Sequence, residues 1–169
     1  MNDVRNVLET RCPGLHGRIE QMLIDAEARY SRRTSQPASE FLLEHTQRTA
    51  AIALKISSIE GVDSFLPVLV ALYHDAGKFH DGGYHKDDVA EEEHAAVLAS
   101  GMLAEFGIDR SDIDAVRRAL RALYNDKLPC VGASRIVHVV MYVDHVEFRA
   151  RHLVHRHMQH RCRMEILQQ

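Results

Sequence analysis

Residues 65–78 read FLPVLVALYHDAGK, and this stretch decides the fold. Its first nine residues are apolar on every side, which in a soluble protein predicts a helix that other elements surround. An imidazole, a carboxylate and an ammonium group then follow within five residues, at His74, Asp75 and Lys78. A buried carboxylate is costly unless it is paired or bound to a metal. We therefore expect the functional site at the C-terminal end of this helix.

The composition is that of an ordinary soluble globular protein. The 169 residues suffice for one domain with a substantial core, and the chain is 46% hydrophobic and 27% charged. The formal net charge of −3 gives no general basic surface, so nucleic acid is not an expected partner.

The cysteine pattern and the apolar runs indicate a cytoplasmic protein. Cys12, Cys130 and Cys162 are far apart and form no Cys-x-x-Cys motif, which argues against a disulfide framework and a zinc–thiolate site. The opening residues do not resemble a signal peptide. The longest apolar runs, residues 65–73 and 139–143, are too short to span a bilayer, so a membrane is not an expected partner.

Apolar residues recur at helical spacing along the chain, and no strand-like alternation persists. The pattern predicts an all-α fold, a single-domain bundle of about six to seven helices. Helices of residues 1–38 pack on a core of residues 39–149, and residues 150–169 form a basic helical tail rich in histidine and arginine. The tail could meet nucleotide phosphate, RNA or an acidic subunit, or remain a solvated helix. The predicted helices cover residues 1–13, 17–33, 39–60, 63–77, 89–106, 111–125 and a stretch from 133.

Two of these helices receive a specific orientation. In residues 17–33 the charged face is placed outside, with Arg18, Glu20, Asp25, Glu27 and Arg29. In residues 89–106 one face is expected to hold His94, Val97, Leu98, Gly101, Met102 and Phe106. The polar residues 79–88 before it contain Gly82-Gly83, which predicts a mobile loop that could lie over a site.

Four polar residues would each destabilise the fold if they were buried without a partner. His45 falls on the apolar face of its helix, and Asp144 directly follows an apolar run, as His74 and Asp75 do. For His45 taken alone, a hydrogen-bonded core histidine is the alternative. A divalent cation would compensate all four residues, and two imidazoles with two carboxylates suit Mn, Fe, Ni, Co, Mg or Zn. Coordination positions left open to water or substrate would make the site catalytic.

The pattern His…His-Asp…Asp on an all-helical bundle resembles the HD-domain metal-dependent phosphohydrolases. The resemblance spans about residues 39–149, and HDAGK at residues 74–78 is similar to the HDxGK form of that family. The dipeptide alone is weak evidence, since His80-Asp81 repeats it. The specificity comes from HDxGK at the end of an apolar helix, with His45 before it and Asp144 at the end of a second apolar helix.

The resemblance implies that His45, His74, Asp75 and Asp144 ligate the metal. It also implies that Asp75 orients or deprotonates a metal-bound water, which attacks phosphorus. Lys78 would hold a phosphate oxygen and offset developing charge. The alternative for Lys78 is an exposed charge that interacts favourably with the helix dipole.

His94 resembles the first additional histidine of the family branches that bind two metals. The next helix ends in Leu123-Tyr124-Asn125-Asp126 and offers no histidine, which favours one firmly bound metal. Asn125 and Asp126 are the candidate substitutes there, so a second metal near His94 is an alternative. We expect His94 to contact phosphate or protonate the leaving oxygen, and a structural histidine is the other interpretation. His80 and His85 could reach the substrate or be solvated loop residues.

The function implied is hydrolysis of a phosphate ester, mono- or diester, of a nucleotide or similar small molecule. A homo-oligomer is compatible with this function. The alarmone-hydrolase branch does not fit, since it carries two acidic residues where this chain has Gly77-Lys78. The alternative is a regulatory module of the family that binds metal and nucleotide with little or no turnover.

Overall fold

The computed structural model describes residues 3–34, 41–85 and 89–123. These residues form six helices and no strand, which confirms the all-α fold. The predicted helix from residue 133 and the tail of residues 150–169 lie outside the described residues. The six helices are α1 (Val4–Arg11), α2 (Leu15–Thr34), α3 (Phe41–Ile59), α4 (Phe65–Tyr73), α5 (Val89–Glu105) and α6 (Arg110–Ala122).

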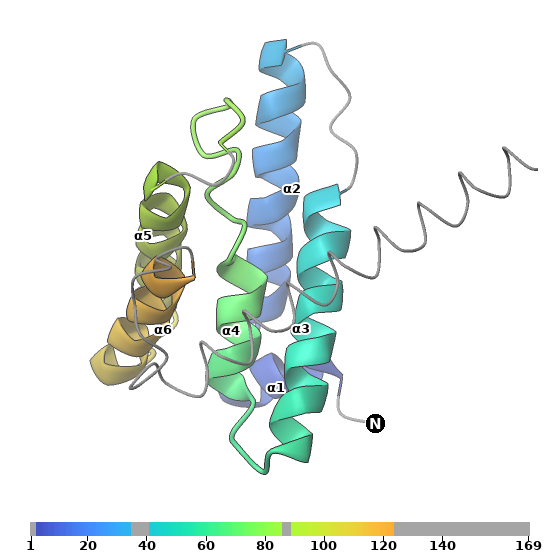
Figure 1. Ribbon diagram of the computed structural model, residues 1–169, viewed down its shortest axis with the longest axis vertical. Coiled ribbons are helices and arrows are strands. Elements are labelled where there is room, and N and C mark those ends of the chain that lie inside the picture. Colours follow the sequence, from blue (N-terminus) through green and yellow to red (C-terminus); the bar gives the residue numbers. More distant parts are fainter. Residues whose placement is uncertain (1–2, 35–40, 86–88, 124–169) are drawn as a thin grey trace, which may run out of the picture.

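Helix α4 is the centre of the bundle, as its all-round apolar sequence predicts. It packs against α1, α3, α5 and α6, and eight of its nine residues are buried. Figure 1 shows α4 between α3 on one side and α5 and α6 on the other. Complete burial of each large apolar side chain is worth about 1.5–3 kcal/mol, so α4 is a firm support for the residues that follow it.

The start of α4 is fixed by a short turn. Gly61 adopts a left-handed φ of 63° after the end of α3, a conformation in which glycine has no steric penalty. The carboxylate of Asp63 then accepts a hydrogen bond from the Phe65 backbone N–H at 3.1 Å. Pro67 follows in the first turn, where a missing N–H costs little. Together these residues set where α4 begins and therefore where its C-terminal end lies.

The predicted apolar face of α5 is only partly the buried one, since Met102 is buried and Leu98 and Phe106 pack against the core. The buried residues of the helix are Glu91, Glu92, Ala95, Ala96, Ala99, Met102 and Leu103, whereas Val97 is 58% exposed. A close backbone approach explains this orientation, because a Cβ on Gly77 would lie 1.9 Å from the Glu91 carbonyl oxygen and 3.1 Å from the Ala95 nitrogen. Only the alanine side of α5 leaves room for the turn after α4.

The predicted exposure of Glu27 is wrong. Glu27 is only 7% exposed, and its carboxylate accepts a hydrogen bond from the Leu42 backbone N–H at 2.5 Å. The first N–H groups of a helix have no partner within the helix, so a carboxylate from a neighbouring element can satisfy them. Glu27 thereby joins α2 to the first turn of α3, one turn before His45.

Candidate metal centre

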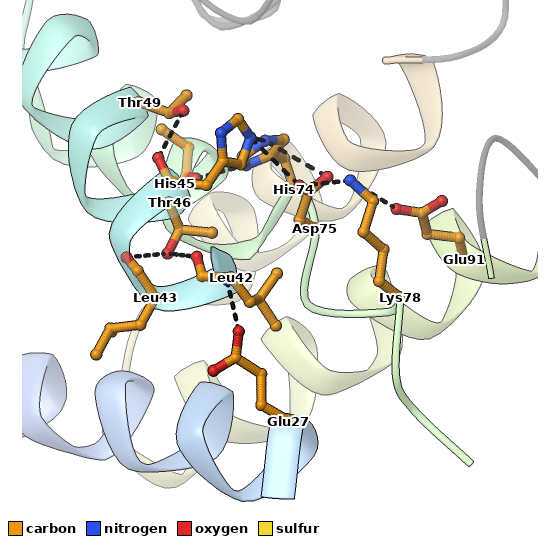
Figure 2. A network of polar contacts seen from close by, with 11 residues as sticks. Glu27, Leu42, Leu43, His45, Thr46, Thr49, His74, Asp75, Lys78 and Glu91 are labelled. Carbon is orange, nitrogen blue, oxygen red and sulfur yellow. Dashed lines mark hydrogen bonds and ion pairs between the residues drawn. The ribbon is translucent and has the colours of Figure 1, made fainter. Parts of the chain in front are cut away.

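Helices α3 and α4 bring three potential metal ligands together. His45 projects from α3, while His74 and Asp75 follow the last residue of α4 (Figure 2). The Nε2 atom of His45 lies 3.0 Å from Nε2 of His74 and 3.3 Å from Oδ2 of Asp75. The Nε2 atom of His74 lies 3.5 Å from Oδ1 of Asp75. His45 therefore faces the His-Asp pair, as a shared metal site requires.

The orientation of the His74 ring is set by the helix that carries it. Its Nδ1 atom lies 2.7 Å from the Ala71 carbonyl oxygen, which can only accept a hydrogen bond. Nδ1 therefore carries the proton, and in the neutral ring Nε2 presents its lone pair to His45 and Asp75. A backbone carbonyl behind a histidine ligand fixes the tautomer in this way in many metal sites.

The geometry of the three donors fits a divalent cation. Metal–ligand bonds of about 2.0–2.2 Å with angles of about 90–110° place neighbouring donor atoms roughly 2.8–3.6 Å apart. The three separations of 3.0, 3.3 and 3.5 Å all fall in this range. The fourth predicted ligand, Asp144, lies outside the described residues, as do Asn125 and Asp126. His45, His74 and Asp75 are therefore a potential metal-binding cluster within the described part of the chain.

Asp75 remains anionic although it is almost completely buried. Burial alone would raise its pKa, but electrostatic interactions with His74, Lys78 and His45 and a hydrogen bond from Lys78 hold the pKa of Asp75 below its ordinary value. The Nζ atom of Lys78 lies 2.5 Å from Oδ2 of Asp75. Burial would lower the pKa of Lys78, but Asp75 and then Glu91 raise it, so the ammonium form is stabilised. Because its side chain is only 13% exposed, the interpretation of Lys78 as an exposed helix-terminal charge is wrong.

Glu91 is a site residue that the sequence analysis missed. Its side chain is completely buried, and its Oε1 atom lies 3.8 Å from Nζ of Lys78 (Figure 2). In the sequence, Glu91 belongs to an acidic run that is typical of a solvated first turn. The signal that could have identified it is its register with Ala95 and Ala99, which together form the small-residue side of α5.

The structure places the other predicted histidines in a separate group. The ring of His94 lies 3.1 Å from that of His80, and the His80 ring lies 4.7 Å from that of His85, measured between centroids. In the described residues, none of these three belongs to the donor cluster of His45, His74 and Asp75. The substrate-facing roles of His80, His85 and His94 therefore stay predictions.

The loop that carries His80 and His85 is attached to α2. The ring of Phe79 packs against Tyr30 at 4.8 Å and against Tyr84 at 5.5 Å, measured between centroids. The guanidinium of Arg33 donates a hydrogen bond to the Asp81 carbonyl oxygen at 2.6 Å. These contacts anchor the described part of the loop, which the sequence predicted to be mobile.

A cavity of about 630 Å³ lies between α2 and α5, away from this cluster. Arg18, Arg29, Arg32, Val97 and Leu98 are among the residues that line it, and none of the predicted site residues that the structure describes does. Substrate chemistry belongs where the buried charges converge, so we assign no catalytic role to this cavity.

The comparisons with known proteins agree with this geometry. The family model of the HD domain matches residues 42–149, which is more than half of the chain. No curated protein and no solved structure matches the chain significantly. Among the described helices, none has the length and apolar character needed to cross a membrane. The match includes the helices that carry the three converging donors, and the chain belongs to the HD domain family.

Proposed function

We propose that the protein is a metal-dependent phosphohydrolase that cleaves a phosphate ester of a nucleotide or a similar small molecule. The observation that carries the proposal is the convergence of His45, His74 and Asp75 with the ammonium group of Lys78 beside them. Metal donors alone would fit a structural site. A buried cation next to the donors is what a substrate with anionic oxygens requires.

Each residue of the centre has a chemical role in this proposal. His45, His74 and Asp75 hold the cation, with Asp144 as the predicted fourth ligand. When bound, a divalent cation supplies Lewis acidity toward a phosphate oxygen and lowers the pKa of a coordinated water. The anionic carboxylate of Asp75 orients the attacking water and accepts its proton.

Lys78 and His94 act on the phosphate in this proposal. Lys78 binds a phosphate oxygen and offsets the negative charge that develops during attack. Glu91 lies on the other side of the Lys78 ammonium from Asp75 (Figure 2), and its Oε1 atom is 3.8 Å from Nζ. His94 contacts phosphate or protonates the leaving oxygen.

A screen of the full chain tests the proposal. Nucleotides and generic phosphate esters are offered with added Mn²⁺, Co²⁺, Ni²⁺ or Mg²⁺, and metal content is measured in parallel. Asp75→Asn is expected to lower both metal content and hydrolysis, with a loss of rate of at least about a hundredfold, typical of a lost catalytic proton acceptor. Glu44→Gln is the matched control, because Glu44 neighbours His45 but is 61% exposed and pairs with Arg48. Unchanged metal content and hydrolysis in Asp75→Asn would contradict the proposal.

The alternative is a regulatory module that binds metal and nucleotide without turnover. The observation that favours it is that the described helix after α5, α6, contains no histidine for a second metal. The same screen separates the two functions. Nucleotide binding that depends on Asp75 without any product would support the regulatory module.

A further inference from the structure

The loop between α4 and α5 repeats the donor set of the metal centre. His80, Asp81 and His85 offer three donor atoms that all lie within 4.8 Å of one another, a property shared among the described residues only with His45, His74 and Asp75. Each group has two imidazoles and one carboxylate, and each contains a His-Asp dipeptide. The loop group contains none of the residues to which the proposed phosphohydrolase activity assigns a role.

The separations in the loop group match those of the metal centre. Oδ1 of Asp81 lies 3.1 Å from Nε2 of His85 and 3.5 Å from Nδ1 of His80. Two imidazoles that share one ion place their ring centroids roughly 4.5–5.3 Å apart, given bonds of about 2.0–2.1 Å. The centroids of His80 and His85 are 4.7 Å apart, and those of His45 and His74 are 5.0 Å apart.

A hydrogen-bonded turn explains only part of this arrangement. Oδ1 of Asp81 accepts hydrogen bonds from the Gly83 N–H at 2.8 Å and from His85 Nε2 at 3.1 Å, which closes the turn. His80 is not needed for that turn. Its Nδ1 atom is buried and makes no hydrogen bond to any residue that the structure describes, and it lies 3.5 Å from Oδ1 of Asp81. A buried ring nitrogen without a hydrogen bond is costly unless a ligand uses its lone pair.

The surroundings of His80 keep its imidazole neutral. Its ring lies against the rings of both His85 and His94, where a protonated imidazole would be repelled if either neighbour were charged. Burial lowers the pKa of His80, and the charges of His94 and His85 lower it further against the opposing effect of Asp81. A neutral imidazole is the form that binds metal ions.

We propose that His80, Asp81 and His85 form a second metal site, which takes a transition-metal ion such as Zn²⁺, Co²⁺ or Ni²⁺. Two imidazoles and one carboxylate favour these ions over Mg²⁺ or Ca²⁺, which prefer oxygen ligands. The donors come from one short loop, so this ion is separate from the one assigned to α3 and α4. It is also distinct from a second ion on His94, because His94 belongs to neither donor group among the described residues.

Equilibrium dialysis of the full chain against Zn²⁺ tests this site. A loop variant carries Asp81→Asn and His85→Gln, and a centre variant carries His45→Gln. The substituted amides can still form the hydrogen bonds of the Asp81 turn but are poor metal ligands. We expect each variant to lose one bound Zn²⁺ relative to the unmodified protein, and the combined variant to lose both.

Histidines elsewhere in the chain require a control, because the C-terminal residues include His155 and His157. A variant with both changed to Gln is expected to keep the Zn²⁺ that the loop variant loses. The proposal is overturned if the loop variant binds as many Zn²⁺ ions as the unmodified protein with the same affinity. It is also overturned if the control variant loses that ion instead.

A single substitution keeps the test valid if the loop variant does not fold, as judged by circular dichroism. Asp81→Asn alone retains an oxygen for the Gly83 N–H and removes only the charge. It is expected to weaken the loop ion by at least about tenfold, the size of effect that even outer partners of a metal site produce. Unchanged Zn²⁺ affinity in this folded variant would overturn the proposal, whatever the outcome of the hydrolysis screen.

Discussion

The metal centre at the end of α4 and the loop cluster of His80, Asp81 and His85 contain the same residue types in different surroundings. At the centre, Asp75 is 1% exposed and its neighbours come from two packed helices. In the loop, Asp81 is 50% exposed and both histidines lie within four residues of it. The chemistry of a His-Asp dipeptide therefore depends on the side chains that pack around it.

The two carboxylates also keep their charge for different reasons. Burial opposes the charge of Asp75, and His74, Lys78 and His45 outweigh it. The pKa of Asp81 is lowered to about 2 by hydrogen bonds from the Gly83 N–H and from His85, with almost no opposing burial. The negative charge of Asp75 therefore depends on the neighbouring side chains. The negative charge of Asp81 depends on the hydrogen bonds of one turn.

The largest expected effect comes from removing the ammonium group beside Asp75. Lys78→Met leaves Asp75 and Glu91 without that cation in a buried place, which should lower the free energy of unfolding by about 3–5 kcal/mol. Added Mn²⁺ should recover more stability in this variant than in the unmodified protein, because the cation offsets the same charge. Chemical denaturation with and without Mn²⁺ measures both effects.

Lys55→Met is the control for this prediction, since Lys55 is exposed on α3. It should change the stability by less than about 0.5 kcal/mol. If Lys78→Met changes the free energy of unfolding as little as Lys55→Met does, the metal centre does not depend on its ammonium group. The proposed difference between Asp75 and the loop carboxylate would then be wrong.

The next effect concerns the close contact between the turn after α4 and α5. Gly77→Ala should destabilise the protein by about 3 kcal/mol, at the upper end of overpacking effects, because its Cβ would meet the Glu91 backbone rather than a flexible side chain. Gly101→Ala is the matched control, since its Cβ meets nothing within 4 Å and alanine favours the helix by about 0.5–1 kcal/mol. Thermal unfolding of both variants measures the difference. Equal unfolding temperatures would contradict the close approach.

A smaller loss of stability is expected when the hydrogen bond from the first turn of α3 to Glu27 is removed. Glu27→Ala removes the acceptor of the Leu42 N–H and should cost about 1–2 kcal/mol, the range found for lost helix caps. Glu27→Gln keeps an acceptor oxygen and should cost less. Denaturant titration of the two variants measures how much of the stabilisation needs only an acceptor oxygen and the volume of the side chain. Equal losses would contradict this prediction, because they would show that the negative charge of Glu27, which both variants lack, carries the whole effect.

The smallest expected effect on stability comes from an exposed ion pair, which shows how much pairing contributes without burial. Asp63 pairs with Arg11 at 2.6 Å, but its side chain is 60% exposed. Burial raises the pKa of Asp63, but the Phe65 N–H and Arg11 together outweigh it and hold the pKa below the ordinary value of 3.8. The pair should contribute about 0.2–1 kcal/mol.

The sign of the pH dependence follows from the lowered pKa of Asp63. The contribution is complete above the unfolded pKa and is lost as pH falls through the lower folded pKa. The stability difference between the unmodified protein and Asp63→Asn should therefore be constant from about pH 5 to 7 and shrink below about pH 4. A difference that grows on acidification would contradict this assignment.

The fold and the convergence of His45, His74 and Asp75 could be predicted from the sequence because their signals are local. The HDAGK motif directly follows the apolar α4, and this combination marks the site in the sequence. His45 could be chosen because helical spacing places it on the apolar face of its own helix. The face of α5 could not be chosen, because alanines and other apolar residues occur on most of its sides. Glu27 and Glu91 were missed because their burial depends on contacts with Leu42 and Lys78, distant in the sequence. Asp144 remains a prediction.

The backbone N–H of His85 donates a hydrogen bond to the Lys78 carbonyl oxygen at 2.8 Å. The chain thus leaves the centre at Lys78 and returns to the same point, so residues 79–84 form a closed excursion. Phe79 is buried against Tyr30, so this excursion stays attached to α2 while the close contact at Gly77 holds the turn after α4 against α5. Substitutions at its exposed positions can therefore alter the loop cluster without changing the helices that hold Asp75.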